Sequence, residues 1–279
     1  MNAVLPRENL LLSELMALTQ SDVPRECLSI RSVHSHQIKA FNVDAPMLAL
    51  PLQGYKRVCD KGEWLHVAPG ELFVVPGPRT LDIENYPAAD GGDYMAVAIP
   101  LYPNALQAAR LLLQCAAPQA VEAGRVATVP LSAIAEPLAR WIEALRSGEP
   151  FTTCHAVVGI LLRLHALGHR SLLNEPVLTL AMQIRAMVAA EPARDWASSD
   201  IEDALGMSGA TLRRRLAAEG LQLRAILAEA RLSLGLNLLL STRLPVKSVA
   251  ARVGYASVSS FVKRFSERYG VEPSRVGGN

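Results

Sequence analysis

Two stretches in the C-terminal third place cations on the outward side of a helix, where they can contact a polyanion. They are residues 198–216, SSDIEDALGMSGATLRRRL, and residues 244–265, LPVKSVAARVGYASVSSFVKRF. Each pattern indicates a short amphipathic helix, a turn that contains glycine, and a longer helix opened by serine. This is the layout of a helix-turn-helix motif.

The second helix of the first motif has one apolar side. Leu212 and Leu216 lie four residues apart and define it. At about 100° per residue, Arg214 points directly away from these leucines, with Ala210 on the same side and Arg213 on the flank. Small neighbours allow a helix to enter the major groove, where arginine pairs with guanine.

The second helix of the second motif follows the same rule. Phe261 and Phe265 define its buried side, and Lys263 points directly away beside the small Ser259. The flanking residues are Val262 and Arg264. Lysine in this position can contact guanine or a phosphate.

The turns have matching chemistry in both motifs. Gly206 and Gly254 can adopt positive φ, and Ser208 and Ser257 can cap the helices that follow them. Arg213 to Arg215 alone would favour a plain helical bundle with a basic surface. The tandem arrangement favours DNA binding instead.

Residues 223–241 indicate one helix between the two motifs, with apolar residues on two sides. One stripe is Leu223, Leu227, Ala230, Leu234 and Leu238, and the other is Leu232, Leu236 and Leu239. A helix that is apolar on two sides must be covered on both. At ~1.5 Å per residue it spans about 27 Å, near the ~34 Å of one DNA turn.

Charge is unevenly distributed along the 279 residues. Residues 1–175 carry 14 Lys and Arg against 17 Asp and Glu, whereas residues 176–279 carry 14 against 9. A basic C-terminal third fits a polyanion partner. The four cysteines, Cys27, Cys59, Cys115 and Cys154, are scattered singly, which argues against a zinc site or a disulfide framework.

The N-terminal part changes pattern twice. Between residues 27 and 100, apolar runs of four to eight residues alternate with Gly, Pro and Asp turns, which predicts a β-sandwich or barrel. Residues 10–18 predict a short amphipathic helix, and residues 104–116, 131–148 and 153–168 predict helices that cover the sheets or pair with a second subunit. No signal peptide or membrane span is expected, so we expect a cytoplasmic protein without membrane contact.

The stretch from about residue 180 to 273 resembles the AraC/XylS family of transcription regulators. The matching positions are Gly206-Met207-Ser208, Leu212, Arg214, Gly220, Arg231-Leu232, Leu238-Leu239, Val246, Val249-Ala250, Gly254-Tyr255, Ser257, Phe261, Phe265, Gly270 and Pro273. Lys263 stands where arginine is usual. Glu202, Leu216 and Ile226 also depart from the family pattern, so the first motif is less typical than the second.

This resemblance implies which residues contact DNA. The family positions correspond to Ala210, Arg213 and Arg214 in the first motif, and to Val258, Ser259, Val262 and Lys263 in the second. With the two capping serines and one flanking cation, the predicted DNA-binding residues are Ser208, Ala210, Arg213, Arg214, Ser257, Val258, Ser259, Val262, Lys263 and Arg264.

Residues 67–77, VAPGELFVVPG, resemble the cupin-like effector domains of the same family. The predicted fold is α+β: a cupin-like β-barrel with flanking helices, then an all-α domain of two helix-turn-helix motifs joined by a linker helix. The predicted domains are residues 1–103 for the effector domain, 104–173 for a helical dimerisation region and 174–279 for DNA binding.

The alternative interpretation is a metal-dependent cupin enzyme with a helical appendage. His34 and His36 have H-x-H spacing, but Lys39 stands where a carboxylate ligand would follow. We therefore predict no enzyme, no metal and no cofactor. The candidate effector-binding residues are His34, His36, Tyr55, Arg57 and Arg79.

Together these patterns predict a sequence-specific regulator of transcription, an activator that binds double-stranded promoter DNA. The implied partners are RNA polymerase, a second copy of the chain in a homodimer, and a small-molecule effector or protein partner at the N-terminal domain.

Overall fold

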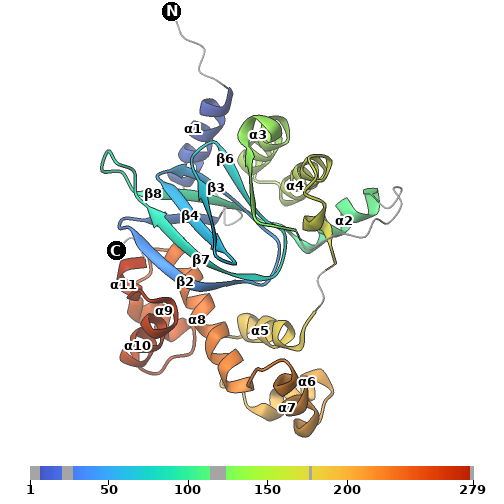
Figure 1. The fold of residues 1–279 in the computed structure, drawn as a ribbon, viewed down its shortest axis with the longest axis vertical. Coiled ribbons are helices and arrows are strands. Elements are labelled where there is room, and N and C mark those ends of the chain that lie inside the picture. The colour runs from blue at the N-terminus through green and yellow to red at the C-terminus, as the bar shows by residue number, and fades with distance from the viewer. Residues whose placement is uncertain (1–6, 21–27, 114–123, 176–177, 277–279) are drawn as a thin grey trace, which may run out of the picture. The chain divides into compact units, whose positions relative to one another are not determined.

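The computed structural model describes residues 7–20, 28–113, 124–175 and 178–276, so Cys27 and Cys115 lie outside the described residues. The chain divides into two compact units, residues 1–176 and 177–279 (Figure 1). The strands of the N-terminal unit are β1 (Leu28–Ser32), β2 (His36–Val43), β3 (Met47–Gln53), β4 (Tyr55–Asp60), β5 (Glu63–Val67), β6 (Glu71–Val75), β7 (Arg79–Tyr86), β8 (Tyr94–Ile99) and β9 (Ala127–Pro130).

These strands form two separate antiparallel sheets. Of the two predicted architectures, a β-sandwich or a barrel, the described strands form the sandwich. One sheet has the order β1-β8-β3-β6-β9 and the other β2-β7-β4-β5. Alternation of buried and half-buried residues along β7 shows that one side of the second sheet faces a core. Side chains of the two sheets meet there, because Nζ of Lys56 on β4 lies 5.9 Å from the ring centroid of Tyr94 on β8.

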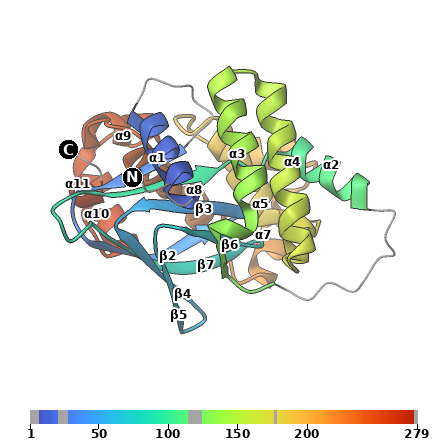
Figure 2. The same cartoon turned by 90° about the horizontal axis from the view of Figure 1, so that it is seen from above.

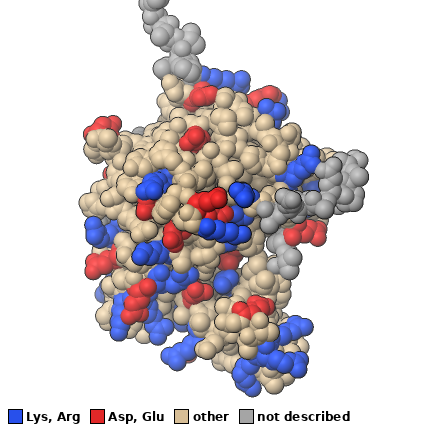
Figure 3. All heavy atoms as spheres, in the orientation of Figure 1, with Lys and Arg blue, Asp and Glu red and all other residues tan. Residues whose placement is uncertain are grey.

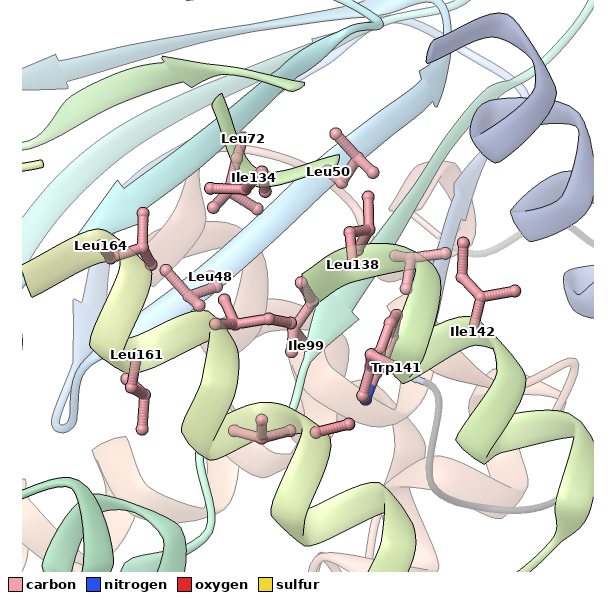
Figure 4. Close-up of a cluster of buried hydrophobic side chains, with 14 of the residues drawn as sticks. Leu48, Leu50, Leu72, Ile99, Ile134, Leu138, Trp141, Ile142, Leu161 and Leu164 are labelled. Atoms are coloured by element: carbon pink, nitrogen blue, oxygen red, sulfur yellow. The ribbon is translucent and has the colours of Figure 1, made fainter. Parts of the chain in front are cut away.

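Helices cover the outer side of the first sheet. The helices of this unit are α1 (Arg7–Gln20), α2 (Pro103–Leu113), α3 (Leu131–Ser147), α4 (Pro150–Ala166) and the 3-10 helix η1 (Arg170–Leu173). The four α-helices agree with the predicted helical segments, whereas η1 was not predicted. Figure 4 shows leucines of β3 and β6 packed against apolar side chains of α3 and α4, with Trp141 of α3 fully buried among them. Figure 2 shows α3 and α4 side by side.

Pro137 lies inside α3, although proline removes an amide that would bond the carbonyl four residues earlier. That carbonyl belongs to Ala133, and it accepts a hydrogen bond from Nε of Arg163 on α4 at 2.8 Å. The neighbouring helix therefore satisfies the acceptor that proline leaves open.

The C-terminal unit is helical throughout its described residues. Its helices are α5 (Leu180–Ala190), α6 (Ser198–Leu205), α7 (Gly209–Ala218), α8 (Leu223–Ser241), α9 (Val246–Arg252), α10 (Val258–Tyr269) and α11 (Pro273–Val276). Figure 1 shows α8 running between α6–α7 and α9–α10. No helix in the described parts of the chain is both long and apolar enough to cross a bilayer.

Candidate nucleic-acid interface

The first helix-turn-helix motif consists of α6, a turn and α7. Gly206 ends α6 with φ of 61°, in the left-handed region where glycine is favoured. Ser208 is the N-cap of α7, and its side chain accepts from the amide of Thr211 at 3.3 Å. The predicted turn and cap are confirmed.

The second motif repeats this geometry with α9 and α10. Gly254 follows the end of α9 with φ of 80°. Ser257 is the N-cap of α10 and accepts from the amide of Ser260 at 3.4 Å. The two motifs therefore use the same residue types for the same local purpose.

Helix α7 buries one side and exposes the other. Leu212 and Leu216 are buried in a core shared with α5, α6 and α8. Ala210, Arg213 and Arg214 are exposed, as the helical phase predicts. Arg215 is also exposed, and its Nη1 lies 3.9 Å from the sulfur of Met207.

Helix α10 shows the same division. Phe261 and Phe265 are buried, with their ring centroids 5.4 Å apart. The predicted DNA-binding residues Val258, Ser259, Lys263 and Arg264 are exposed, and Val262 is half-buried. The hydroxyls of Ser257 and Ser259 lie 2.7 Å apart at the start of the helix.

The exposed cations of these two helices are available to a partner. Among the described residues, no acidic side chain forms an ion pair with Arg213, Arg214 or Lys263. Figure 3 shows Lys and Arg side chains gathered at the lower end of this unit, where Figure 1 draws α7, and mixed with acidic side chains at the left, where it draws α10. A DNA phosphate or base edge could therefore pair with them without first breaking a protein ion pair.

Helix α8 connects the two motifs, and its burial differs in part from the prediction. Leu232, Leu236 and Leu239 are buried as expected. On the other side the fully buried residue is Ile226, whereas Leu223 and Leu227 are only partly buried against the same core. The reason is that α5 packs on the side of Ile226, which helical phase alone does not reveal.

Glycine in the middle of α8 makes room for the second motif. A Cβ on Gly235 would lie 2.9 Å from the ring of Phe261. The backbone of α8 therefore approaches an aromatic side chain of α10 directly.

Glu202, a departure from the family pattern, lies against the start of α7. Its Oε1 accepts from the hydroxyl of Ser198 at 2.7 Å, and a Cβ on Gly209 would lie 2.6 Å from the same oxygen. Glycine at the first position of α7 thus leaves space for a carboxylate. A negative charge is favourable there because helix N-termini carry partial positive charge.

Sequence reasoning missed three charged residues that meet on α8. Glu229 contacts Nη2 of Arg185 on α5 at 3.6 Å and Nη2 of Arg268 on α10 at 3.0 Å. An acidic residue within the apolar pattern of residues 223–241 was the available signal.

The predicted effector-binding residues do not converge on one site. His34 is exposed, whereas His36 is buried and its Nδ1 lies 2.9 Å from the hydroxyl of Ser32. Tyr55 stacks between the rings of His66 and Tyr86, with centroids 4.9 and 4.6 Å away.

The two predicted arginines are engaged in other contacts. Arg57 pairs with Glu84 at 3.1 Å and lies over the ring of Trp64. Arg79 pairs with Asp60 at 2.8 Å. Among the described residues no group of His, Cys, Asp and Glu is arranged to hold a metal ion.

A different set of polar residues lies between the sheets, and we call it the interior cluster: Ser32, His36, Lys56, Asn85 and Tyr94. In the second sheet, Asn85 of β7 pairs in register with both His36 and Lys56. From the first sheet, Tyr94 places its ring centroid 5.9 Å from Nζ of Lys56. The signal for Lys56 was its period of two with Val58, which puts both side chains on one face.

The interior cluster is electrostatically unusual. Burial lowers the pKa of Lys56 from 10.5 to about 8, and burial also raises the pKa of Tyr94. No Asp or Glu is among the buried residues of the described chain. Oη of Tyr94 and Oδ1 of Asn85 have no hydrogen-bond partner among the described residues.

Comparisons with known proteins identify the C-terminal unit. Residues 201–278 match the family described as helix-turn-helix domain. A helix-turn-helix-type transcriptional regulator of Mycobacterium tuberculosis is 46% identical over 76 residues, which are 27% of this chain and 22% of that protein. The virulence regulon transcriptional activator VirF of Shigella flexneri is 33% identical over 98 residues, 35% of this chain and 37% of its own. The chain thus spans well under half the length of these relatives.

Solved structures share the fold of nearly the whole chain. An apo ToxT variant from Vibrio cholerae has a TM-score of 0.63 at 15% identity and covers 91% of this chain and 97% of its own. ToxT with a bound unsaturated fatty acid has a TM-score of 0.60 at 14% identity, with 91% and 95% covered. These likenesses show a common fold with an N-terminal β unit and a helical C-terminal unit. From its motif geometry and its match to the family model, the C-terminal unit of this chain contains a helix-turn-helix domain.

Proposed function

We propose that this chain is a cytoplasmic, sequence-specific regulator that activates transcription by binding promoter DNA. Its two recognition helices would be α7 and α10. The observation that carries the proposal is that both helices expose cations beside small residues while burying their apolar sides. VirF, a relative over this segment, is named a transcriptional activator. RNA polymerase is the partner that an activator requires.

Arg214 provides the test of base recognition. We expect Arg214→Ala to cost ~1–3 kcal/mol on the selected operator and to relax base choice at one position. Operators are first selected from random duplex DNA with the full chain, and binding is then measured at fixed salt concentration. Equal weakening on all sequences would make Arg214 a phosphate contact, and failure to select any sequence would refute the proposed function.

We further propose that a small anionic effector binds the N-terminal unit at the interior cluster. Burial disfavours the charged form of Lys56, and a bound anion would stabilise that charge because no carboxylate among the described buried residues does so. Of the effector residues predicted from sequence, only His36 belongs to this cluster. The fatty acid bound by ToxT, which shares the fold, is an anion of this kind.

Thermal unfolding with and without ligands tests the effector proposal. We expect fatty acids to raise the unfolding temperature of the full chain more than the matched alcohols do, because only the acids carry a charge for Lys56. Lys56→Met is expected to abolish that difference. Equal stabilisation of the wild type and the variant would contradict it.

We propose that the protein forms a homodimer through α2, α3 and α4. These helices border a groove that includes Leu112 and Leu162, and Leu112 is 62% exposed. Exposed apolar groups on adjacent helices favour association. Leu112→Glu is expected to shift the mass measured by light scattering toward the monomer, whereas an unchanged dimer mass would argue against this surface.

A further inference from the structure

Glu229 of α8 forms ion pairs with both halves of the C-terminal unit. We call α5, α6 and α7 the first half, and α9 and α10 the second half. Oε2 of Glu229 lies 3.6 Å from Arg185 of α5, and its Oε1 lies 3.0 Å from Arg268 of α10. The three side chains are only 19 to 30% exposed. Ion pairs that are this well covered are screened less by salt than surface pairs.

The arginines belong to opposite halves. Helix α5 contributes to the core of the first motif, with Ile184 and Val188 packed against Ile201 and Leu212. Arg268 lies on α10 of the second motif, with its guanidinium over the ring of Tyr269. The carboxylate of Glu229 is therefore shared between a cation of each half.

A second link joins the halves at a different place. Nη2 of Arg231 on α8 donates to the carbonyl of Arg194, in the loop between α5 and α6, at 2.7 Å. The carbonyl oxygen of Pro192 in that loop would lie 2.6 Å from a Cβ on Gly254. The loop of the first half thus touches the turn of the second motif.

The two motifs bury separate sets of apolar side chains, so the ion pairs of Glu229 are not needed to keep either motif folded. The first motif buries Leu212 and Leu216, and the second buries Phe261 and Phe265. Each can retain its own packing when Glu229 is changed. What changes is how firmly α10 is held relative to α5 and α7, because Arg185 and Arg268 then face each other with like charge.

We propose that Glu229 is a positioning residue that fixes the separation and the angle of the two recognition helices, α7 and α10. The protein therefore binds DNA with one spacing between the half-sites. This inference rests on the proposed function. Inserting one base pair between half-sites moves one of them by ~3.4 Å and turns it by about 35°. A rigid pair of helices cannot follow that change and loses one half-site, whereas a loosened pair can follow it in part.

The test compares DNA spacing in matched variants of the full chain. Operators selected from random duplex DNA are rebuilt with one base pair added or removed between the two recognised segments. Binding is measured for the wild type, Glu229→Gln and Glu219→Gln. The control removes the same charge from an exposed residue after α7. Circular dichroism establishes that each variant is folded.

The wild type is expected to prefer the original spacing by about 100-fold, because simultaneous engagement of both sites is lost otherwise. Glu229→Gln is expected to reduce this preference about tenfold, and Glu219→Gln to leave it unchanged. If Glu229→Gln does not fold, Glu229→Asp is used, which keeps the charge with a shorter reach and is expected to reduce the preference less.

Three results would overturn the inference while leaving the proposed function in place. They are an unchanged preference in the folded Glu229 variant, an equal reduction in the control, and selected operators with a single recognised segment. By contrast, absence of any selected sequence would refute the proposed function itself.

Discussion

Replacing Gly254 by alanine, with Gly206→Ala as its matched control, tests the packing of the second turn. Both glycines have φ in the left-handed region, at 80° and 61°. Their surroundings differ, because a Cβ on Gly206 would meet nothing within 4 Å. A Cβ on Gly254 would lie 2.6 Å from the carbonyl oxygen of Pro192.

The expected destabilisation follows from these two terms. Left-handed backbone costs alanine ~1–2 kcal/mol, and the reduced freedom of the unfolded chain returns about 0.4–1 kcal/mol. Gly206→Ala should therefore reduce the free energy of unfolding by about 1 kcal/mol. Gly254→Ala adds a steric overlap worth ~1–3 kcal/mol, because a backbone oxygen cannot rotate away, for a total of about 2–4 kcal/mol.

Hydrogen exchange followed by mass spectrometry measures the effect in the intact chain, motif by motif. Amides of α9 and α10 should lose protection in Gly254→Ala, and amides of α6 and α7 should lose less in Gly206→Ala. If the Gly254 variant lost no more protection than the Gly206 variant, the close approach to Pro192 would be refuted.

Three further predictions concern other elements. Ser257→Ala should cost α10 about 1 kcal/mol of local stability and Ser257→Gly only a few tenths, measured by hydrogen exchange, and equal losses would argue against the cap. Because the pKa of Lys56 falls from 10.5 to about 8 on folding, the unfolded chain binds more protons between these values. Stability should therefore rise with pH across that window, by on the order of 3 kcal/mol, as measured by urea unfolding, and Lys56→Met should remove the rise. Gly235→Ala should destabilise the second motif because overpacking of ~1–3 kcal/mol against Phe261 exceeds the ~1 kcal/mol gain in helix propensity, and increased protection of α10 would contradict this.

The buried faces and the caps of individual helices could be predicted well from the sequence. The buried pairs Leu212 with Leu216 and Phe261 with Phe265 follow from helical phase, and Ser257 caps its helix because the hydroxyl bonds an amide three residues later. Such features depend on neighbours within one or two turns. Membership of the helix-turn-helix domain family follows from the same local pattern.

Contacts between distant segments could not be predicted in this way. The folded sheet stacks the ring of Tyr55 between those of His66 and Tyr86, and the spacing of these residues along the chain does not predict that contact. Lys56, one residue later, points between the sheets instead. A period of two assigns residues to opposite faces, but only the pairing of the sheets decides which face is interior.

By itself the sequence determined two serine-capped helices with outward cations and an apolar helix between them, because period and capping are properties of the chain over a few residues. The tertiary structure alone decided that Ile226 is buried, that Glu229 is shared by Arg185 and Arg268, and that Lys56 is enclosed. These depend on which elements pack together, and residues 185 and 268 meet only after the chain has folded.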